Sequence, residues 1–351
     1  MIVPKSRHHN LCLLGFGNVG RALVRLLDAK KRELRQRYGI RYRITGVASR
    51  RLGWIADPAG LSAAALLAAG KGTRPRGQKA REPRNVREWL RAAKADVLFE
   101  ITSLDRRNGQ PAIEHIRAAL HAGVHAITAN KGTIVFAYEE LKRLAAKKRK
   151  RFLFESTVMD GVPVFSLFRE SLPTIELRAF RGILNSTSNF VLSQIEAGLS
   201  LDEAVSKAQQ LGVAETDPSD DLDGWDAAVK IAALSTVLFG VSLKLDKIPR
   251  AGIRSLDPAA ICAARAGGRP YKLVCRAERN GRRVRASVGP QQVEASDPLA
   301  KVNGTSSCIQ FTMDSLPSLT LTELNPGIEA TAYGLLADFI RAAREPQAID
   351  R

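Results

Sequence analysis

The sequence predicts an α/β protein with a doubly wound parallel sheet in its first half and a second, α+β domain after it. Short apolar segments alternate with segments of helical periodicity over about the first 150 residues, which is typical of a parallel sheet. A glycine-rich turn joins the first such pair, and the alternation ceases beyond residue 160. The predicted domains are residues 8–154 plus 322–351, and residues 155–321.

Length and composition indicate a folded protein. The chain has 351 residues, of which 45% are hydrophobic, so it can bury a core and is not intrinsically disordered. Its four cysteines are far apart and form no Cys-x-x-Cys, which favours reduced thiols over a zinc site or a disulfide framework. The apolar run at 61–70 is too short to cross a bilayer, and the N-terminus lacks a signal-peptide core. We therefore expect a cytoplasmic protein with no membrane partner.

Positive charge is in excess but uneven. Lys and Arg number 54 against 35 Asp and Glu, for a net charge of +19, and they cluster at 30–43, 71–94 and 142–151. A nucleic-acid surface is one interpretation, but the clusters are poor in aromatic residues and carry no nucleic-acid motif. We expect solvated basic faces and no nucleic-acid partner, with attraction of anions as the remaining alternative.

Residues 11–27 have the pattern of a strand, a glycine-rich turn and a helix. An apolar strand (11–14) meets Gly-x-Gly-x-x-Gly, and apolar residues then repeat at helical spacing. Gly15 permits the turn, Gly17 lets backbone approach a pyrophosphate, and Gly20 lets the helix pack on the strand. This setting predicts a Rossmann-type dinucleotide site rather than an ordinary glycine-rich turn. The predicted cofactor loop comprises Gly15, Phe16, Gly17, Asn18, Val19 and Gly20.

The next predicted strand (43–49) bears on cofactor choice. An NAD site commonly ends this strand with Asp or Glu on the ribose hydroxyl, but here the chain reads Ser49-Arg50-Arg51. A guanidinium can bind a 2′-phosphate through two hydrogen bonds. The sequence therefore favours NADP, with NAD possible if both arginines are only solvated loop charges.

The alternation continues with a strand at 96–102, a helix at 111–123, a strand at 124–128, a helix at 137–149 and a strand at 151–157. In parallel sheets, ligands bind at the carboxyl ends of the strands. Thr102, Ser103, Asn130 and Lys131 follow such ends and are candidates for cofactor or substrate contacts. For Lys131, an ordinary surface lysine is the alternative.

The second half contains an acidic segment. A strand is expected at 175–184 and a helix at 200–212, with Ser200 and Glu203 forming a capping box. The acidic segment 214–230 follows, "AETDPSDDLDGWDAAVK". An EF-hand register that places Gly224 at position 6 puts Lys230 where the bidentate Glu belongs, which excludes that calcium loop.

The helix after the acidic segment carries a lone cation. From Ala227 to Leu243 the only charged residue is Lys230, so we expect a buried helix with a desolvated lysine. Asp226 lies four residues earlier and shares its face. Such a pair can serve as a proton donor or acceptor, or as a clamp on a polar substrate. A purely structural ion pair is the alternative.

Together these residues resemble homoserine dehydrogenase, over essentially the whole chain from Leu11 to about Asp338. The most specific stretch is 182–230, where "GILNSTSNFVL" precedes "KAQQLGVAETDPSDDLDGWDAAVK". Four other segments also resemble the family: "TANKG" (128–132), "ESTVMDGVPV" (155–164), "DPLAKVNG" (297–304) and "PGIEATAYGLLADF" (326–339).

The resemblance implies reversible, NAD(P)-linked interconversion of L-aspartate 4-semialdehyde and L-homoserine, on the route to threonine and methionine. It implies that Lys230 is the proton donor, that Asp226 and Glu215 bind the substrate, and that Lys131 lies beside cofactor and substrate. It further implies a homodimer of the short monofunctional form, without a C-terminal regulatory domain. Gly212 and Gly327 would approach the cofactor, and a sodium or potassium ion would be held by Glu155 and by main-chain oxygens of Val158, Asp160 and Val162.

The sequence also departs from the family's usual pattern. Ser186 stands where the family usually has Gly, and Met159-Asp160 replaces a glycine-rich pair in the cation segment. Glu329 and Ser306-Ser307 are further departures. Two rival functions are an NADP-binding redox sensor that contacts nucleic acid, and a dehydrogenase of a related amino-acid aldehyde. The first predicts a degraded catalytic set, yet the spacing of Glu215, Asp226 and Lys230 is intact.

Overall fold

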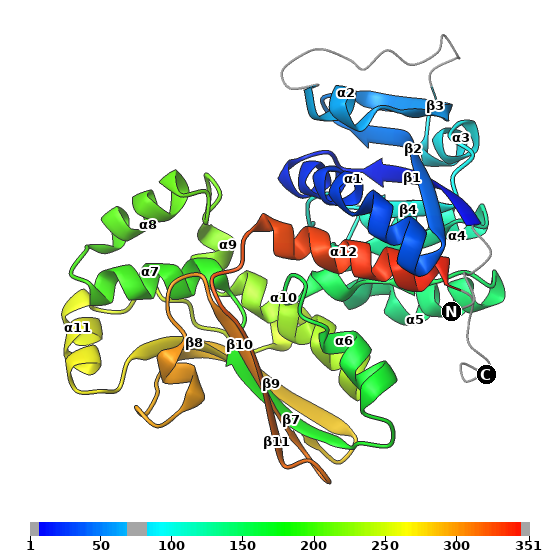
Figure 1. The fold of residues 1–351 in the computed structure, drawn as a ribbon. Helices are drawn as coiled ribbons and strands as arrows, with labels where there is room; N and C mark the ends of the chain where they lie inside the picture. Colours follow the sequence, from blue (N-terminus) through cyan, green and yellow to red (C-terminus); the bar gives the residue numbers. More distant parts are fainter. Residues whose placement is uncertain (1–6, 69–82, 345–351) are drawn as a thin grey trace. The chain divides into compact units, whose positions relative to one another are not determined.

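The computed structural model describes residues 7–68 and 83–344 (Figure 1). The chain divides into two compact units, unit 1 (Met1–Pro163 with Gly327–Arg351) and unit 2 (Val164–Pro326). Each unit is built around its own β-sheet.

Unit 1 contains the predicted doubly wound sheet, with strand order β3-β2-β1-β4-β5-β6. Five strands are parallel, which confirms the predicted fold class. The edge strand β3 was not predicted, and it pairs antiparallel with β2, so the sheet is mixed. Pro58 and Gly60, which are typical of turns, lie inside this strand. The strands are β1 (Arg7–Leu14), β2 (Ile40–Ser49), β3 (Gly53–Leu61), β4 (Val97–Glu100), β5 (His125–Thr128) and β6 (Phe152–Leu153).

Helices cover both faces of this sheet, so its central strands are apolar on both sides. Leu11 and Leu13 of β1 pack in one core with α1 and α12, whereas Cys12 and Leu14 pack in a second core with α3, α4 and α5. This alternation accounts for the unbroken apolar run that predicted the strand. The helices are α1 (Asn18–Tyr38), α2 (Ala63–Ala68), α3 (Val86–Ala92), α4 (Ala112–His121), α5 (Gly132–Lys147) and α12 (Ile328–Ala343).

The last helix returns the chain to unit 1. Phe339 of α12 makes edge-to-face ring contacts with Tyr42 and Phe99 of the sheet. Residues 155–163 lie in unit 1 rather than beyond its boundary, because Glu155 N–H donates to Asp338 Oδ2 of α12 (2.8 Å). Residues 322–326 lie in unit 2, because strand β11 runs to Glu323.

Unit 2 is an α+β structure with a five-stranded antiparallel sheet in the order β11-β10-β7-β8-β9. The β8–β9 hairpin was not predicted. The helix expected to reach Leu243 ends at Leu234 and continues as a π-helical segment, Ser235–Phe239. The elements are α6 (Val164–Ser166), β7 (Leu177–Ile183), α7 (Ser186–Glu196), α8 (Leu201–Gln210), α9 (Ser219–Leu222), α10 (Trp225–Leu234), α11 (Pro258–Ala266), β8 (Tyr271–Asn280), β9 (Arg283–Gln292), β10 (Ser307–Met313) and β11 (Ser318–Glu323).

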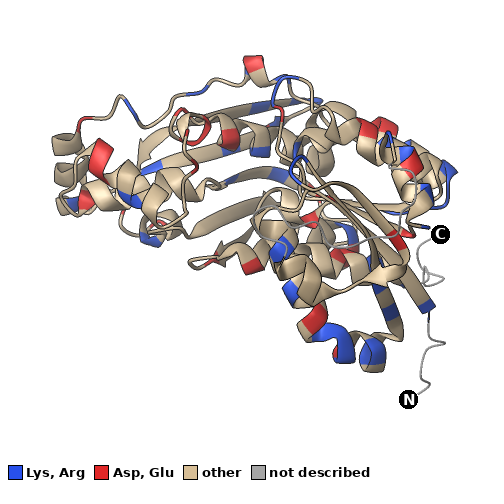
Figure 2. Cartoon of the chain, turned by 90° about the horizontal axis from the view of Figure 1, so that it is seen from above, with Lys and Arg blue, Asp and Glu red and all other residues tan. Residues whose placement is uncertain are grey.

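The charged residues are spread over the described chain, with Lys and Arg interleaved with Asp and Glu (Figure 2). Some of the basic residues are paired, as in Arg117, whose guanidinium bonds both Glu114 and Glu140. Residues 71–82 of the second basic cluster lie outside the described residues. Within the described ranges, no helix combines the length and the apolarity needed to cross a bilayer.

Candidate active site

The glycine-rich loop joins β1 to α1 in the predicted manner. Gly15 has φ = +100°, and a Cβ there would lie 2.3 Å from Ile101 O. A Cβ on Gly20 would lie 2.8 Å from Gly15 O, so the loop packs tightly on its inner side. Gly17 differs, because a Cβ there would meet no atom within 4 Å. Gly17 also caps α1 without any side-chain hydrogen bond, which leaves the first N–H groups of the helix open to a ligand.

The end of β2 lies beside this loop, since Gly15 N–H donates to Ala48 O (2.9 Å). Ser49 Oγ accepts a hydrogen bond from Leu52 N–H (3.1 Å) and so shapes the turn that follows. Arg50 and Arg51 are exposed on that turn. Within the described part of the chain, neither guanidinium has a hydrogen-bond or ion-pair partner.

The loops after β4 and β5 are tied together by Asn130. Its side-chain amide donates to Thr102 O (3.1 Å) and Ser103 O (3.2 Å), and its Oδ1 accepts from Gly132 N–H (2.9 Å). Lys131 directly precedes α5. Because β1, β4 and β5 are parallel neighbours, these loops share the sheet edge that carries the glycine-rich loop.

Sequence reasoning missed Glu100 at this edge. Its side chain is fully buried and accepts hydrogen bonds from Thr102 N–H (3.2 Å), from the Thr102 hydroxyl and from the Thr128 hydroxyl (3.1 Å). His115 Nδ1 lies 3.4 Å from the same carboxylate. Glu100 therefore fixes the strand ends beneath the loops. A single carboxylate at the end of the apolar segment "VLFE" was the signal.

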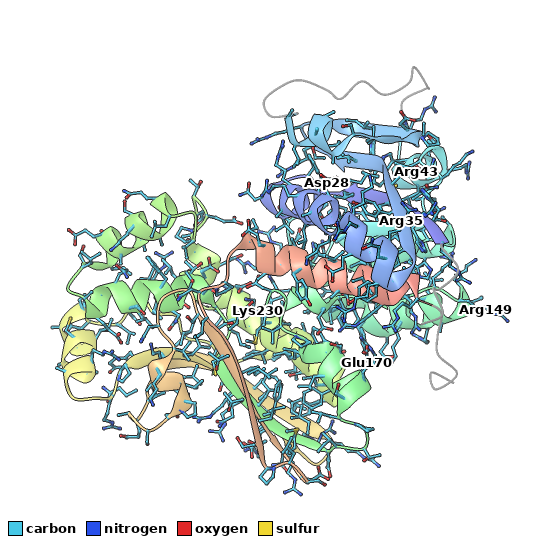
Figure 3. All side chains as sticks on the ribbon, viewed as in Figure 1. Asp28, Arg35, Arg43, Arg149, Glu170 and Lys230 are labelled. Atoms are coloured by element: carbon cyan, nitrogen blue, oxygen red, sulfur yellow. The ribbon has the colours of Figure 1, made fainter. Side chains whose placement is uncertain are left out.

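In unit 2, Lys230 projects from α10 (Figure 3). Its ammonium donates to Leu184 O at 2.5 Å and lies 3.3 Å from Asp226 Oδ2. The two side chains are 15% and 17% exposed, so Lys230 is less desolvated than the sequence predicted. The predicted pairing with Asp226 is present, and apolar neighbours such as Val229 and Ile231 are buried.

Two further polar residues adjoin this pair. The Asn185 amide nitrogen donates to Asp226 Oδ2 (3.0 Å) and to Asp221 Oδ1 (2.6 Å). Burial raises the pKa of Asp221, and the nearby charge of Asp226 raises it further. From the sequence, Asp221 was expected only as part of the acidic segment, and Asn185 had no predicted role. The structure thus joins two carboxyl groups, one amide and one ammonium.

Glu215 and Gly212 lie apart from these contacts. The segment after α8 is held by Gln209, whose amide nitrogen donates to Glu215 O (3.2 Å). Glu215 is exposed, and its carboxylate forms no hydrogen bond or ion pair within the described residues. Gly212 has φ = +70° and open space where a Cβ would project. Among the described residues, the Glu215 carboxylate thus has no direct contact with Asp226 or Lys230 through a hydrogen bond or ion pair.

The predicted cation ligands lie in unit 1 beside α12. Glu155 is buried, and its Oε2 lies 3.3 Å from Arg341 Nη1, which also bonds Asp338 Oδ1 (3.1 Å). Burial first, and then the charge of Glu155, raises the pKa of Asp338 to about 7. Two buried carboxyl groups thus share one guanidinium. Arg341 and Asp338 had no predicted role.

The chain turns tightly between Val158 and Val162. Asp160 has φ = +43°, and its Oδ1 accepts a hydrogen bond from the Thr331 hydroxyl (2.6 Å). Val162 N–H donates to Met159 O (2.8 Å). Gly327 caps the nearby helix α12 without a side-chain bond, and a Cβ there would lie 3.0 Å from Glu329 Oε2.

The comparisons with known proteins cover both units. Residues 163–340 match the family model for homoserine dehydrogenase, and residues 15–155 match the model for the homoserine dehydrogenase NAD binding domain. The NAD(+)-dependent homoserine dehydrogenase of Pseudomonas canavaninivorans is 36% identical over 95% of each chain. A homoserine dehydrogenase of Methanocaldococcus jannaschii is 30% identical over 94% of this chain and 97% of its own.

Solved structures that resemble this chain are also homoserine dehydrogenases. Homoserine dehydrogenase from Thermoplasma acidophilum superposes with a TM-score of 0.80 at 25% identity, covering 95% of this chain and 99% of that one. A hyperthermophilic archaeal homoserine dehydrogenase mutant in complex with NADPH gives 0.77 at 27% identity, covering 96% and 98%. The chain belongs to the homoserine dehydrogenase family.

Proposed function

We propose that Lys230 is the proton donor and acceptor of the homoserine dehydrogenase reaction and that Asp226 orients it. As a family member, the chain is an NAD(P)-dependent oxidoreductase that interconverts L-homoserine and L-aspartate 4-semialdehyde. The contacts of the Lys230 ammonium support the proposal. The ammonium donates to Leu184 O and lies 3.3 Å from Asp226 Oδ2, and these contacts fix its position on α10.

The chemistry demands such a group. Reduction of the aldehyde places a negative charge on its oxygen, and a positioned ammonium both stabilises that charge and delivers the proton. In the reverse direction, the neutral amine accepts the hydroxyl proton of homoserine. The carboxylates of Asp226 and Asp221 attract the substrate ammonium. Glu215 and Lys131 stay proposed substrate and cofactor contacts on the strength of the resemblance.

The glycine-rich loop fits a dinucleotide. Gly17 leaves open space in front of the uncapped N-terminus of α1, and the first turn of that helix carries no acidic residue. We propose that these N–H groups bind the pyrophosphate, and that Thr102, Ser103 and Gly327 contact other parts of the cofactor. Gly212 stays a proposed cofactor contact on the strength of the resemblance alone. When bound, the nicotinamide supplies or accepts the hydride.

An assay of substrates tests the proposed function against a related amino-acid aldehyde dehydrogenase. We expect oxidation of L-homoserine with NADP or NAD, followed at the absorbance of the reduced cofactor, and no turnover of threonine, serine or malate. Comparable turnover of any of these three controls would favour the rival substrate class.

We further propose a preference for NADP. The relatives' names include an NAD(+)-dependent enzyme and an NADPH complex, so both cofactors occur within the family. In this chain, Arg50 and Arg51 at the end of β2 are exposed and have no partner among the described residues. They are therefore available to bind a 2′-phosphate.

Arg50→Ala should weaken NADP binding roughly ten- to a hundredfold while changing NAD binding little, because a guanidinium–phosphate contact contributes about 1.5–3 kcal/mol. Fluorescence titration with NADPH and NADH measures both dissociation constants. Arg41→Ala, an exposed arginine at the opposite end of β2, is the control. Equal losses for the two cofactors in Arg50→Ala would contradict the preference.

The cluster around Glu155 supports a monovalent cation site. Oxygen donors from one carboxylate and three carbonyls suit sodium or potassium. Glu155 and Asp338 share the single guanidinium of Arg341. A cation beside Glu155 would give its buried carboxylate a second positive partner. We therefore propose that Glu155, with main-chain oxygens of Val158, Asp160 and Val162, holds it.

Sodium or potassium chloride should raise the melting temperature above that in choline chloride of equal ionic strength. Occupancy at ten times the dissociation constant adds about 1.4 kcal/mol, or roughly 2–4 °C. Glu155→Gln should abolish the difference, whereas Glu140→Gln, in the exposed pair with Arg117, should preserve it. A salt-specific rise that survives in Glu155→Gln would exclude Glu155 as a ligand.

Assembly and location are also proposals. We propose a homodimer, as the family resemblance implies, and sedimentation equilibrium should give twice the mass of the chain. We propose a cytoplasmic location because all four cysteines lack disulfide partners, which suits a reducing compartment.

A further inference from the structure

In unit 2, the side chain of Asn185 joins two carboxylates, those of Asp221 and Asp226. It precedes α7 and is buried, at 3% exposure. Its Oδ1 accepts a hydrogen bond from Ser188 N–H (2.7 Å) and so caps the helix. This bond fixes the orientation of the amide, because the oxygen faces the helix and the nitrogen must face away from it. The nitrogen then meets Asp221 and Asp226.

The donors and acceptors match in number. An amide nitrogen carries two hydrogens, and two carboxylates accept them, at 2.6 Å for Asp221 and 3.0 Å for Asp226. Asp226 Oδ2 is also the atom that lies 3.3 Å from the Lys230 ammonium. The preceding residue, Leu184, supplies the carbonyl that accepts from the same ammonium. Two consecutive residues therefore hold both the lysine and its carboxylate.

We propose that Asn185 is a positioning residue of the dehydrogenase reaction: its amide holds the carboxylates of Asp221 and Asp226 in place and, through Asp226, aligns the Lys230 ammonium. This inference rests on the proposed roles of Lys230 and Asp226. It goes beyond them by assigning the alignment to a residue that does not itself exchange a proton.

Electrostatics gives the amide a second effect. Carboxylates that share a site repel each other, and hydrogen bonds to the charged forms offset that repulsion. The groups facing Asp221 are Asp226 and Lys230 of α10, Thr187 of α7, and Asn185, the residue before α7. Burial and Asp226 raise the pKa of Asp221, whereas the Asn185 amide lowers it. Loss of the amide should therefore move the acid limb of the activity profile to higher pH.

Helix capping offers a way to separate this role from a structural one. Ser and Asp both cap helices about as well as Asn, so they preserve the bond to Ser188. A serine hydroxyl has one hydrogen and a shorter reach, so it cannot bridge both carboxylates. Asn185→Asp removes both donor hydrogens and adds a third carboxylate beside Asp221 and Asp226.

Asn185→Ser should still fold, because the cap is retained, and its melting temperature should fall by a few degrees because the bonds to the two carboxylates are lost. Its kcat for homoserine oxidation should fall about tenfold, which corresponds to about 1.4 kcal/mol. The acid limb of the profile of kcat against pH should move to higher pH by about half a unit, and the affinity for NADPH should not change. In Asn185→Asp, kcat should be about a hundredfold lower than in the parent, and the acid limb should lie at still higher pH. If Asn185→Asp does not fold, the result for Asn185→Ser alone tests the inference.

The matched control is Asn85→Ser. Asn85 caps α3 by accepting from Glu88 N–H (3.0 Å), and among the described residues its amide nitrogen contacts the single carboxylate of Glu88 (3.5 Å). The same exchange should therefore leave kcat and the pH profile unchanged. Parental kcat and an unmoved acid limb in Asn185→Ser would overturn the inference. An equal fall in Asn85→Ser would overturn it too, because the effect would then belong to helix capping in general.

A double substitution separates this inference from the proposed function. In an Asp226→Asn background, Asn185→Ser should lower kcat less than twofold, because the link to Lys230 is already broken. An undiminished tenfold fall in that background would show that Asn185 does not act through Asp226 and would overturn the inference. Failure of the proposed proton donor would appear instead as full activity in Lys230→Ala.

Discussion

Lys230→Ala should lower kcat by about 10²–10⁴-fold in both directions, the range typical of general acid–base catalysis. The alkoxide formed on reduction needs a proton within hydrogen-bond reach, and the ammonium of Lys230 is held for this by Leu184 O and Asp226. NADPH should bind nearly normally, because the proposed partner of the Lys230 ammonium is the substrate oxygen and not the cofactor. Stopped-flow turnover and fluorescence titration measure the two quantities separately.

Three further variants test the roles of Lys230 and Asp226 more specifically. Lys230→Arg should not restore turnover, because a guanidinium does not release its proton at working pH. Asp226→Asn should impair homoserine binding more than cofactor binding. Lys207→Ala removes an exposed lysine of α8 and should change nothing. Near-parental kcat in a folded Lys230→Ala protein would transfer the proton-donor role elsewhere, and Lys131 would be the next residue to substitute.

Local patterns predicted the parts of the fold that local forces determine. The apolar run of β1, the glycine spacing and the capping box of α8 each act within a few residues, and the structure contains all three. The β8–β9 hairpin also had a local signal, since Asn280-Gly281 lies at its turn and Gly281 has φ = +59°. The sequence carries no such signal for β3, because Pro58 and Gly60 inside that strand are typical of turns.

In the candidate site too, contacts between residues close in the sequence could be predicted, and contacts between distant residues could not. The Asp226–Lys230 pair is four residues apart on one helix, so spacing alone predicts it. Asn185 is 36 and 41 residues from its carboxylate partners, and Arg341 is 186 residues from Glu155. No helical or strand period connects such residues. Their contacts arise only when the sheet of each unit forms, so sequence patterns could not predict them.

Gly17→Ala should leave the fold intact and still weaken NADPH binding by at least about a hundredfold. Its backbone (φ = −86°) suits any residue, and an added Cβ would meet no protein atom within 4 Å. Gly17 is also the N-cap residue of α1, whose first N–H groups have no side-chain cap. A methyl group there would hold the pyrophosphate away from those donors, and charge-assisted hydrogen bonds contribute about 1.5–3 kcal/mol each.

Two other glycines make this prediction specific to the ligand. Gly267→Ala, at a helix end in unit 2 with φ = −76° and ordinary contacts, should change neither the melting temperature nor NADPH affinity. Gly15→Ala should lower both, because its Cβ would collide with Ile101 O in a left-handed backbone conformation. If Gly17→Ala bound NADPH as tightly as the parent, the pyrophosphate could not lie against the start of α1. If it melted as early as Gly15→Ala, the glycine would serve the fold of the loop rather than the approach of the cofactor.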